Sequence, residues 1–441
     1  MFIVLRGCLK RWLADRCGNV AVVFAITCVP LISFVGVAID YSRAALVRTQ
    51  LQGALDTAAV GAIVQKSNAF AEAGAMSGDG EITVGKTDAL NIFNGNASGR
   101  TGFTLNSVTA EVSKTRSVVT SVMTFSADVP TSFTRIMGFD KLTVTGAATA
   151  TATMPQFIDF YLLLDNSPSM GIGATPKDVD DMVAYTPDKC GFACHDTSNT
   201  NSNYNIAKLK GVTTRIDVLR SATQQLMDTA TAMQTYTDQF RMAIYDFGAS
   251  AQTAGLRSLF SLSSSLSSAK TAAGAIDLMA VVGQNDNNDQ DTSFSTILPA
   301  INSAITAPGS GISSAPLKYV FFVSDGVADE ANLYGCPKAT TNGRCQSPIN
   351  PALCKTIKDR GIKIAVLYTT YLDLPTDDWY NRWIAPFNKG PYGPSPNSEI
   401  AQNMQACASP GFYFEVSPTQ GIADAMNALF QKAVADARVS S

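Results

Sequence analysis

We expect an α/β fold for most of this 441-residue chain, built on a doubly wound, mostly parallel sheet. Two apolar runs, beginning at Ile158 and Lys318, each end on an aspartate and are typical of buried parallel strands. Strand-like and helix-like patterns alternate around them, which predicts helices on both faces of the sheet. Before residue 155, an apolar helix and a run of alternating residues predict a transmembrane helix followed by a small α+β region.

The composition limits the classes of protein to consider. With 46% hydrophobic and 16% charged residues, the chain can bury a large core and should hold two or three domains. The formal net charge is −3 and the basic residues form no stripe, which argues against a nucleic-acid partner.

The amino terminus predicts a membrane anchor. Residues 1–17 carry the basic residues Arg6, Lys10, Arg11 and Arg16, and Val20 to Ile39 is an uncharged apolar run long enough to cross a bilayer as a helix. Basic residues on the amino side place that end in the cytoplasm. We therefore expect a cytoplasmic segment at 1–17, a transmembrane helix at 18–41 and all later residues outside the membrane. A cleaved signal peptide is the alternative, because Gly36 and Ala38 are small, but the run is long for one.

Residues 42–154 predict a helix followed by a small sheet. An alanine-rich amphipathic pattern covers 43–72, and residues from about Leu105 to Thr153 alternate and are rich in β-branched side chains. Helix and sheet together give a pilin-like plan between the membrane and the larger domain.

This amino-terminal region resembles that of TadG-like proteins of Flp (Tad) pilus assembly. The resemblance rests on Gly18, Phe24-Ala25, Pro30, the exit from Gly36 to Asp40 and the stretch from Gln50 to Ala62. Related pseudopilins carry a glutamate at the position of Val23, and that glutamate goes with cleavage by a prepilin peptidase. The valine here implies an uncleaved anchor, and the resemblance implies a bacterial inner-membrane protein with a single span, whose bulk is periplasmic or extracellular.

Oxygen-bearing side chains follow the two apolar runs of the larger domain. Asp165, Ser167 and Ser169 come directly after the first run and Asp325 after the second, while Thr292 stands where a loop meets a helical pattern. Ligands bind outside the carboxyl ends of parallel strands, and hard cations prefer oxygen ligands. We expect the five side chains to meet at one metal site, although Asp and Ser are also ordinary turn residues.

The five residues in this order resemble the metal-ion-dependent adhesion site of von Willebrand factor A (VWA) domains. The resemblance implies that the serines and the threonine contact Mg²⁺, or Ca²⁺ or Mn²⁺, that the aspartates act mostly through water, and that an acidic residue of a protein partner completes the coordination. One departure is that Gln290 and Asp291 precede Thr292, where the family usually has glycines.

The VWA resemblance covers 155–441, with an insertion at 171–213. We expect further strands at Phe240–Tyr245, Ser258–Leu262, Ile362–Tyr368 and Phe412–Val416, and helices at Ile216–Met233, Ser268–Ala280, Lys355–Arg360 and Gly421–Ala437.

Cysteine usage fits an oxidising compartment. Three cysteines lie in or before the anchor and six lie outside it, an even number. Six cysteines allow fifteen connectivities. The pairing that we favour joins Cys190 with Cys194, Cys336 with Cys345, and Cys354 with Cys407.

Three further motifs point to other chemistry. Residues from Gly80 to Thr87 satisfy the phosphate-loop pattern, but a small, polar segment precedes them instead of a buried strand. The run from Cys190 to His195 is similar to a haem-attachment motif with one extra residue, and it occurs in this insertion of TadG-like proteins; a disulfide is favoured because His195 is the sole histidine. Asp286, Asp289 and Asp291 lack EF-hand spacing, which favours a solvated acidic loop.

The function expected from these features is pilus assembly, by a membrane-anchored protein that binds a partner from the pilus machinery or the cell surface through the metal. One alternative is a structural minor pilin or adhesin whose metal only braces the loop. A phosphate-loop nucleotidase or a metallohydrolase comes third. Ser167 stands where haloacid-type enzymes carry a second aspartate, which argues against such a hydrolase. The absence of a G-x-S-x-G elbow argues against a Ser-His-Asp triad.

Overall fold

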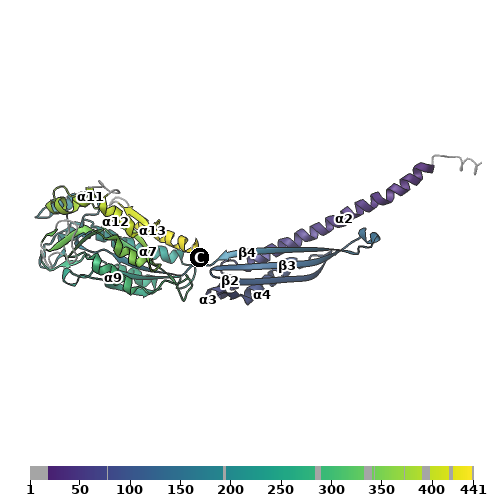
Figure 1. The fold of residues 1–441 in the computed structure, drawn as a ribbon, viewed down its shortest axis with the longest axis horizontal. Coiled ribbons are helices and arrows are strands. Elements are labelled where there is room, and N and C mark those ends of the chain that lie inside the picture. Colours follow the sequence, from purple (N-terminus) through teal and green to yellow (C-terminus); the bar gives the residue numbers. More distant parts are fainter. Residues whose placement is uncertain are drawn as a thin grey trace, which may run out of the picture. The chain divides into compact units, whose positions relative to one another are not determined.

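The computed structural model describes residues 18–76, 78–191, 195–283, 290–331, 340–341, 343–371, 373–389, 398–416 and 421–439. The chain divides into two compact units, Met1–Met154 and Pro155–Ser441 (Figure 1).

A long helix, α2 (Gly18–Gly61), organises the first unit. The helix predicted at 43–72 is not continuous: α2 ends at Gly61, and α3 (Asn68–Ala75) starts anew after a turn in which Lys66 has a φ of 75°. The Ser67 hydroxyl accepts a hydrogen bond from the Phe70 amide at 3.2 Å and so caps α3. Because this cap competes with continuation of the first helix, the amphipathic stretch folds as two helices.

The first unit also holds an antiparallel sheet in the order β1-β2-β3-β4. Its strands are β1 (Gly80–Glu81), β2 (Thr104–Thr115), β3 (Val118–Pro130) and β4 (Lys141–Thr153), with α4 (Thr83–Ala97) after β1 and the short helix η1 (Thr134–Met137) between β3 and β4. Alternate residues of β3 are buried, among them Val119, Met123 and Phe125. α2 and α4 pack on this sheet (Figure 1), as the alternating pattern of the sequence predicts.

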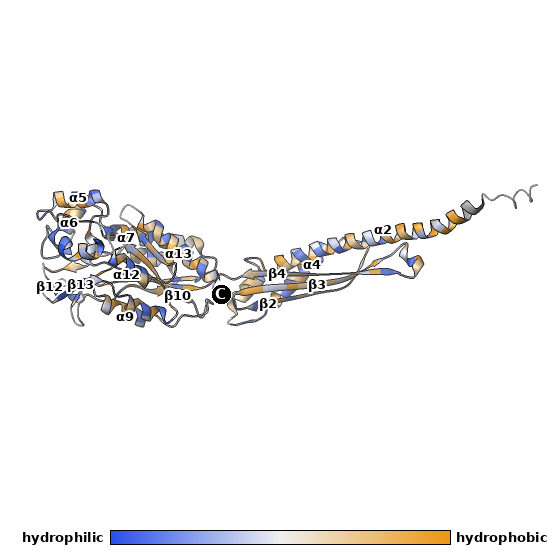
Figure 2. Cartoon of the chain, turned by 45° about the horizontal axis from the view of Figure 1, so that its top comes forward, coloured by the Kyte–Doolittle hydropathy of each residue, from blue (hydrophilic) through white to orange (hydrophobic). Residues whose placement is uncertain are grey.

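The amino-terminal part of α2 extends beyond the sheet. From Val23 to Ile39 its large apolar side chains are exposed, and apolar colouring runs along this part of the helix in Figure 2. By length and composition, α2 is the one described helix that could cross a membrane.

The second unit is built on a six-stranded sheet in the order β15-β14-β10-β5-β7-β8. All neighbours pair in parallel except β8, which runs antiparallel to β7 at one edge. The fold class is therefore the predicted α/β class with a doubly wound, mostly parallel sheet. The strands are β5 (Ile158–Leu164), β7 (Phe240–Asp246), β8 (Arg257–Ser263), β10 (Leu317–Ser324), β14 (Lys363–Thr369) and β15 (Tyr413–Val416).

Helices cover both faces of this sheet, and the buried strand β5 contributes to the core on each side. Phe160 and Leu162 pack in the cluster with α7 (Arg215–Met233), α8 (Leu266–Ala273) and α13 (Ile422–Val439). Tyr161 and Leu163 pack in the cluster with α9 (Phe294–Ala304), α10 (Pro351–Lys358) and α12 (Glu399–Cys407). The helix predicted at 268–280 is too long, since α8 ends at Ala273.

Smaller elements decorate the sheet. The insertion after β5 holds α5 (Pro176–Tyr185), β6 (His195–Asp196) and α6 (Asn203–Lys210). After β10 the chain forms an antiparallel arrangement of β11 (Val327–Ala331), β12 (Thr340–Thr341) and β13 (Arg344–Pro348). The remaining short elements are η2 (Pro168–Gly171), η3 (Ala251–Thr253), β9 (Ala280–Val281), η5 (Tyr380–Ile384) and α11 (Ala385–Lys389).

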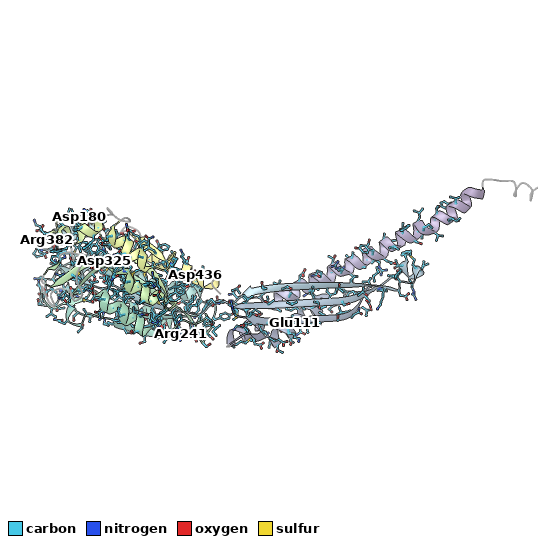
Figure 3. All side chains as sticks on the ribbon, viewed as in Figure 1. Glu111, Asp180, Arg241, Asp325, Arg382 and Asp436 are labelled. Atoms are coloured by element: carbon cyan, nitrogen blue, oxygen red, sulfur yellow. A yellow bond between two sulfur atoms is a disulfide. The ribbon has the colours of Figure 1, made fainter. Side chains whose placement is uncertain are left out.

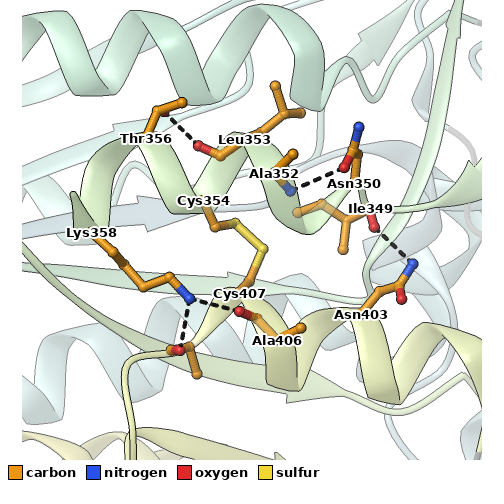
Figure 4. Close-up of a disulfide and its surroundings, with 11 residues drawn as sticks. Ile349, Asn350, Ala352, Leu353, Cys354, Thr356, Lys358, Asn403, Ala406 and Cys407 are labelled. Atoms are coloured by element: carbon orange, nitrogen blue, oxygen red, sulfur yellow. Dashed lines mark hydrogen bonds between the residues drawn. A yellow bond between two sulfur atoms is a disulfide. The ribbon is translucent and has the colours of Figure 1, made fainter.

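A disulfide joins two helices of the second unit. Cys354 of α10 and Cys407 at the end of α12 are bonded, with their Cα atoms 5.1 Å apart (Figure 4), which confirms this predicted pair. The Lys358 ammonium donates beside it to the carbonyl oxygen of Ala406 at 2.7 Å. Cys345 is also disulfide-bonded. Cys194 and Cys336 lie outside the described residues, so the other two pairings stay predictions.

Candidate metal centre

The order of the strands sets the position of the candidate site. β5 lies next to β7, which follows it along the chain, and on its other side next to β10. The two directions of winding therefore diverge between β5 and β10. In doubly wound sheets, ligands bind at the carboxyl ends of the strands at such a switch point. Asp165 and Asp325 directly follow these two strands.

Asp165 lies at the centre of a hydrogen-bonded turn. One carboxylate oxygen, Oδ1, accepts from the Ser167 amide at 2.9 Å and from the Ser167 hydroxyl at 2.6 Å. The other, Oδ2, accepts from the Ser324 hydroxyl at 2.5 Å. The Ser167 and Ser169 hydroxyl oxygens are 3.1 Å apart. Asp165 and Ser167 are fully buried, whereas Ser169 is half-buried at the solvent side of the turn.

Asp325 lacks a full set of hydrogen bonds. Its Oδ1 accepts one long bond from the Val327 amide at 3.5 Å, and its Oδ2 is buried with no hydrogen-bond partner among the described residues. Gly326 follows with a φ of +76°, a conformation that favours glycine and turns the chain away from the strand end. Burying a carboxylate oxygen without a hydrogen-bond donor costs free energy of folding, and a bound proton or cation would offset that cost.

The structure fixes the backbone of Thr292 beside the segment that follows Asp325. Its amide donates to the Asp329 carbonyl at 3.0 Å, and the Asp329 amide donates back to the Thr292 carbonyl at 2.9 Å. Thr292 is buried and immediately precedes Ser293, the residue that caps α9. The predicted position at a loop-to-helix junction is thus observed. Hydrogen bonds join Asp165, Ser167 and Ser169 directly, while Thr292 is connected through this bridge to the strand after Asp325.

Both aspartates have raised pKa values. Burial raises the pKa of Asp165 to about 7, the nearby Asp325 carboxylate adds to the rise, and the hydroxyls of Ser167 and Ser324 oppose it. Burial likewise raises the pKa of Asp325, while the Arg215 guanidinium and the Ser169 hydroxyl oppose the rise. Without a cation, the pair is therefore poised to hold a proton near neutral pH.

Besides Ser324, the site contains two residues that no sequence pattern indicated, Arg215 and Tyr371. Arg215, the first residue of α7, is 2% exposed, and its Nε and Nη1 have no hydrogen-bond partner within the described part of the chain. Burial lowers the pKa of Arg215, and the carboxylate of Asp325 is the largest opposing influence. The centroid of the Tyr371 ring lies 5.5 Å from the guanidinium carbon, Cζ, of Arg215. Burial raises the pKa of the Tyr371 hydroxyl well above its usual value, and the Asp325 carboxylate adds to this.

The fold explains why Arg215 is buried although the sequence does not indicate it. An arginine beside an amphipathic pattern normally lies at the surface. Here the Arg215 amide donates to the Ile172 carbonyl at 3.0 Å, which ties the start of α7 to the chain just after the metal loop. Its guanidinium also donates to the Thr370 carbonyl at the end of β14. No sequence pattern signals such burial, whereas Ser324 directly precedes Asp325 and could have been noted.

The donor set fits a hard divalent cation. The predicted donors are two carboxylates and three hydroxyls, all oxygen ligands of the kind that Mg²⁺, Ca²⁺ and Mn²⁺ prefer. Over the described residues, no group of three or more His, Cys, Asp or Glu side chains is placed to hold a metal. The buried Oδ2 of Asp325 without a donor is the observation in favour of a cation.

The opposite end of the same sheet provides a contrast. Asp159, near the start of β5, is fully buried, and both of its oxygens accept from Arg241, at 2.6 and 2.7 Å. Lys318 donates to it as well. Figure 3 labels Arg241 and Asp325 at separate places in this unit. Asp159 is thus neutralised by two basic side chains, whereas Asp165 and Asp325 form no salt bridge among the described residues.

The phosphate-loop pattern does not form a loop. Strand β1 ends at Glu81, α4 begins at Thr83, and Gly85, Lys86 and Thr87 lie inside that helix. The Lys86 ammonium pairs with Glu81 at 3.3 Å. A Cβ on Gly85 would lie 2.8 Å from atoms of Ala69 and Val112, so this glycine serves helix packing. This geometry gives no backbone cradle for phosphate.

The structure describes only part of the two remaining candidate motifs. His195 lies in β6, with its Nδ1 3.3 Å from the Leu278 carbonyl oxygen. The middle of the motif from Cys190 to His195 is outside the described residues, and so are Asp286 and Asp289 of the acidic cluster. Asp291 is buried beside Thr292, in disagreement with a solvated loop at that position.

Comparison with known proteins supports an association with pili. Residues 18–71 match the Tad family model, which describes Flp pilus-assembly proteins of the TadE/G-like kind. No match is found among curated protein sequences.

Solved structures match this chain at low sequence identity, among them three proteins of pili. The von Willebrand factor domain of the type V pilus tip protein Mfa5 from Porphyromonas gingivalis has 10% identity and a TM-score of 0.36, and the match covers 64% of this chain and 97% of that one. The pilus adhesin SpaC from Lactobacillus rhamnosus GG has 13% identity and a TM-score of 0.35, with 77% and 35% covered. The PilB minor pilin from Streptococcus sanguinis has 12% identity and a TM-score of 0.32, with 76% and 78% covered. The chain thus spans about a third of the SpaC adhesin.

Proposed function

Since residues 18–71 carry a TadE/G-like Flp pilus-assembly segment, we propose that this chain is a membrane-anchored pilus-assembly protein that binds a protein partner through a divalent cation. Asp165, Ser167, Ser169, Thr292 and Asp325 would hold the ion, and an acidic side chain of the partner would complete its coordination. The observation that carries the proposal is the buried Oδ2 of Asp325 at the switch point of the sheet, for which the described part of the chain shows no hydrogen bond.

The charges around the site favour an acidic partner over a basic one. Two carboxylates and one buried guanidinium leave the protein side near −1, and a divalent ion makes the loaded site positive. Because Mg²⁺ dehydrates reluctantly, it would keep exchangeable waters, and a carboxylate could replace one of them. The half-buried Ser169 leaves one side of the turn open to such a ligand. Haloacid-type enzymes carry a second aspartate at the position of Ser167. The serine here therefore agrees with binding better than with catalysis.

Partner capture in cells tests the proposal. The full-length protein is cross-linked in its host and immunoprecipitated with Mg²⁺ or with EDTA. We expect a partner that is retained with Mg²⁺ and lost both with EDTA and in Asp165→Ala. Asp180→Asn is the matched control, because Asp180 is an exposed carboxylate of α5 in the same unit, and it should capture the partner normally. Capture that persists in EDTA contradicts metal-dependent binding.

The same variants separate the alternatives. A structural minor pilin with a bracing metal predicts that Asp165→Ala loses thermal stability but assembles pili normally. A nucleotidase predicts that Lys86→Ala abolishes function, whereas we expect it to behave as the wild type, since Lys86 lies in α4 and pairs with Glu81.

A further inference from the structure

The loop between β3 and β4 exposes a cluster of large apolar side chains. Phe133, Ile136, Met137 and Phe139 are 40%, 86%, 58% and 62% exposed. Arg135 and Asp140, which lie among them in the sequence, form an exposed ion pair at 3.2 Å. Contiguous exposed apolar groups of this size are unusual on a soluble surface and mark contact with a partner or with lipid.

This apolar loop is fixed against α2 at the end of its apolar run. Both oxygens of Asp40 accept from loop groups: Oδ1 from the Ser132 amide at 3.0 Å, and Oδ2 from the amides of Phe133 and Thr134 at 2.8 Å each and from the Thr134 hydroxyl at 2.9 Å. Arg43 donates to the Ser132 hydroxyl at 3.1 Å. The loop therefore has a defined conformation beside the helix.

A glycine allows the closest approach. A Cβ on Gly36 would lie 2.5 Å from the Cβ of Phe133, so only glycine fits there. Between residues 23 and 43, Gly36 and Asp40 are the only buried positions, and both face the loop. Figure 1 shows the β3–β4 connection lying beside α2 where the helix leaves the sheet.

The register along α2 gives the depth of the loop. Gly36 precedes Ile39, the last residue of the apolar run, by three positions, which corresponds to about 4.5 Å along a helix. The headgroup region on each side of a bilayer is roughly 5–7 Å thick. If Ile39 lies at the edge of the hydrocarbon, Phe133 reaches past that edge, and the neighbouring apolar side chains lie in the interface.

We propose that the β3–β4 loop inserts Ile136, Met137 and Phe139 into the membrane interface next to α2, as a second contact with lipid. The inference rests on α2 as the membrane anchor and is independent of the metal site. The loop is held against α2 by its hydrogen bonds to Asp40, so its exposed apolar side chains adjoin the exposed apolar surface of that helix. The same lipid that surrounds α2 is therefore the occupant, and not another protein. At this depth the Asp40 carboxylate loses its hydrogen bonds to water, and the hydrogen bonds from the loop replace them.

Tryptophan quenching by brominated lipid tests the proposal. The full chain, with Trp12, Trp379 and Trp383 replaced by Phe, is reconstituted into vesicles of phosphatidylethanolamine and phosphatidylglycerol that contain brominated phosphatidylcholine. Single tryptophans are then introduced by Phe139→Trp, by Phe34→Trp in the apolar run, and by Val84→Trp at the far end of the sheet.

We expect strong quenching at position 139 by bromine placed near the headgroup, weaker quenching there by bromine near the chain ends, and none at position 84. Quenching at position 34 by deep bromine reports the anchor itself. If position 34 is quenched while position 139 behaves like position 84, the loop proposal is wrong and the anchor stands. If position 34 is not quenched, both are wrong.

A double variant tests whether quenching at position 139 depends on the apolar side chains of the loop. Ile136→Asp with Met137→Asp, in the Phe139→Trp background, should remove most of the quenching at position 139, because carboxylates oppose insertion. The same pair in the Phe34→Trp background should leave quenching at position 34 unchanged. Both substituted side chains are exposed, so folding should be preserved. Unchanged quenching at position 139 would overturn the proposal.

Discussion

Asp165 and Asp325 are buried carboxyls whose described neighbours offer hydroxyl groups and a single guanidinium. The pKa values of both are raised mainly by burial, and the Asp325 carboxylate adds to the rise at Asp165. A divalent cation would relieve both effects at once, whereas a proton relieves only one carboxylate. At the scale of single residues, the metal-free site is therefore sensitive to pH, and the metal-loaded site should be less so.

The pH dependence of stability has a definite sign. A carboxyl whose folded pKa is raised stabilises the fold below its unfolded value, near about pH 4, and this contribution is lost as the pH rises through the folded value, about 7 for Asp165. In EDTA, we expect the free energy of unfolding of the second unit to fall over this range. Denaturant titrations followed by the fluorescence of Trp379 and Trp383 measure it. Asp325→Asn should flatten the slope, and an unchanged slope in that variant would refute the assignment.

Arg215 supplies positive charge beside the pair. We expect Arg215→Met to destabilise the metal-free protein by about 2 kcal/mol at pH 8, because the carboxylates lose their nearest cation, and by less at pH 5, where they are protonated. Saturating Mg²⁺ should reduce the difference. Urea titration at both pH values checks this. Arg382→Met, at an exposed arginine of η5, serves as the control and should change stability by less than about 0.5 kcal/mol. Equal losses at the two pH values would mean that Arg215 acts through packing alone.

At the scale of elements, the sequence predicted the strands better than the helices. The runs that became β5 and β10 are apolar except for Asp159 and Lys318 near their starts and Ser324 at the end of β10. Asp165 and Asp325 follow them directly, so both their type and their ends could be identified. The helix predicted to reach Ala280 stops at Ala273, followed by Gly274. The amphipathic helix broke between Gly61 and Ser67, where a glycine and a capping serine were visible signals. Arg215 could not be predicted, because its burial depends on the contact of α7 with the chain after η2.

The disulfide between α10 and α12 offers a test at this scale. It closes a separation of 53 residues, for which loop-closure entropy gives about 4 kcal/mol. Cys354→Ala with Cys407→Ala should lower the free energy of unfolding by roughly that amount. It should leave metal affinity largely intact, since the bridge lies between helices and not at the strand ends. Denaturant titration and Mg²⁺ calorimetry measure the two effects. A matching loss of metal affinity would show that the bridge also shapes the site.

At the scale of the whole molecule, each unit contributes one part of the proposed role. The first unit carries the Tad-like segment and the helix that could span a membrane. The second unit carries the proposed oxygen ligands at the switch point of its sheet. The proposed anchoring and binding roles thus fall in separate compact units, which predicts that changes at the Asp165 turn do not alter membrane insertion.

That independence can be measured. Asp165→Ala should remain in the membrane fraction after carbonate extraction to the same extent as the wild type, because α2 and the β3–β4 loop belong to the other unit. Quantitative immunoblotting of both fractions is sufficient. Release of the variant from the membrane would show that the metal-binding unit contributes to anchoring.

The most direct measurement is a crystal structure of the full chain grown with Mn²⁺, with anomalous diffraction data collected to locate the ion. We predict one peak in contact with the hydroxyl oxygens of Ser167, Ser169 and Thr292 and near the carboxylates of Asp165 and Asp325. A map without a peak at the Asp165 turn, or with Thr292 turned away from the ion, would contradict the metal site and the partner binding proposed from it.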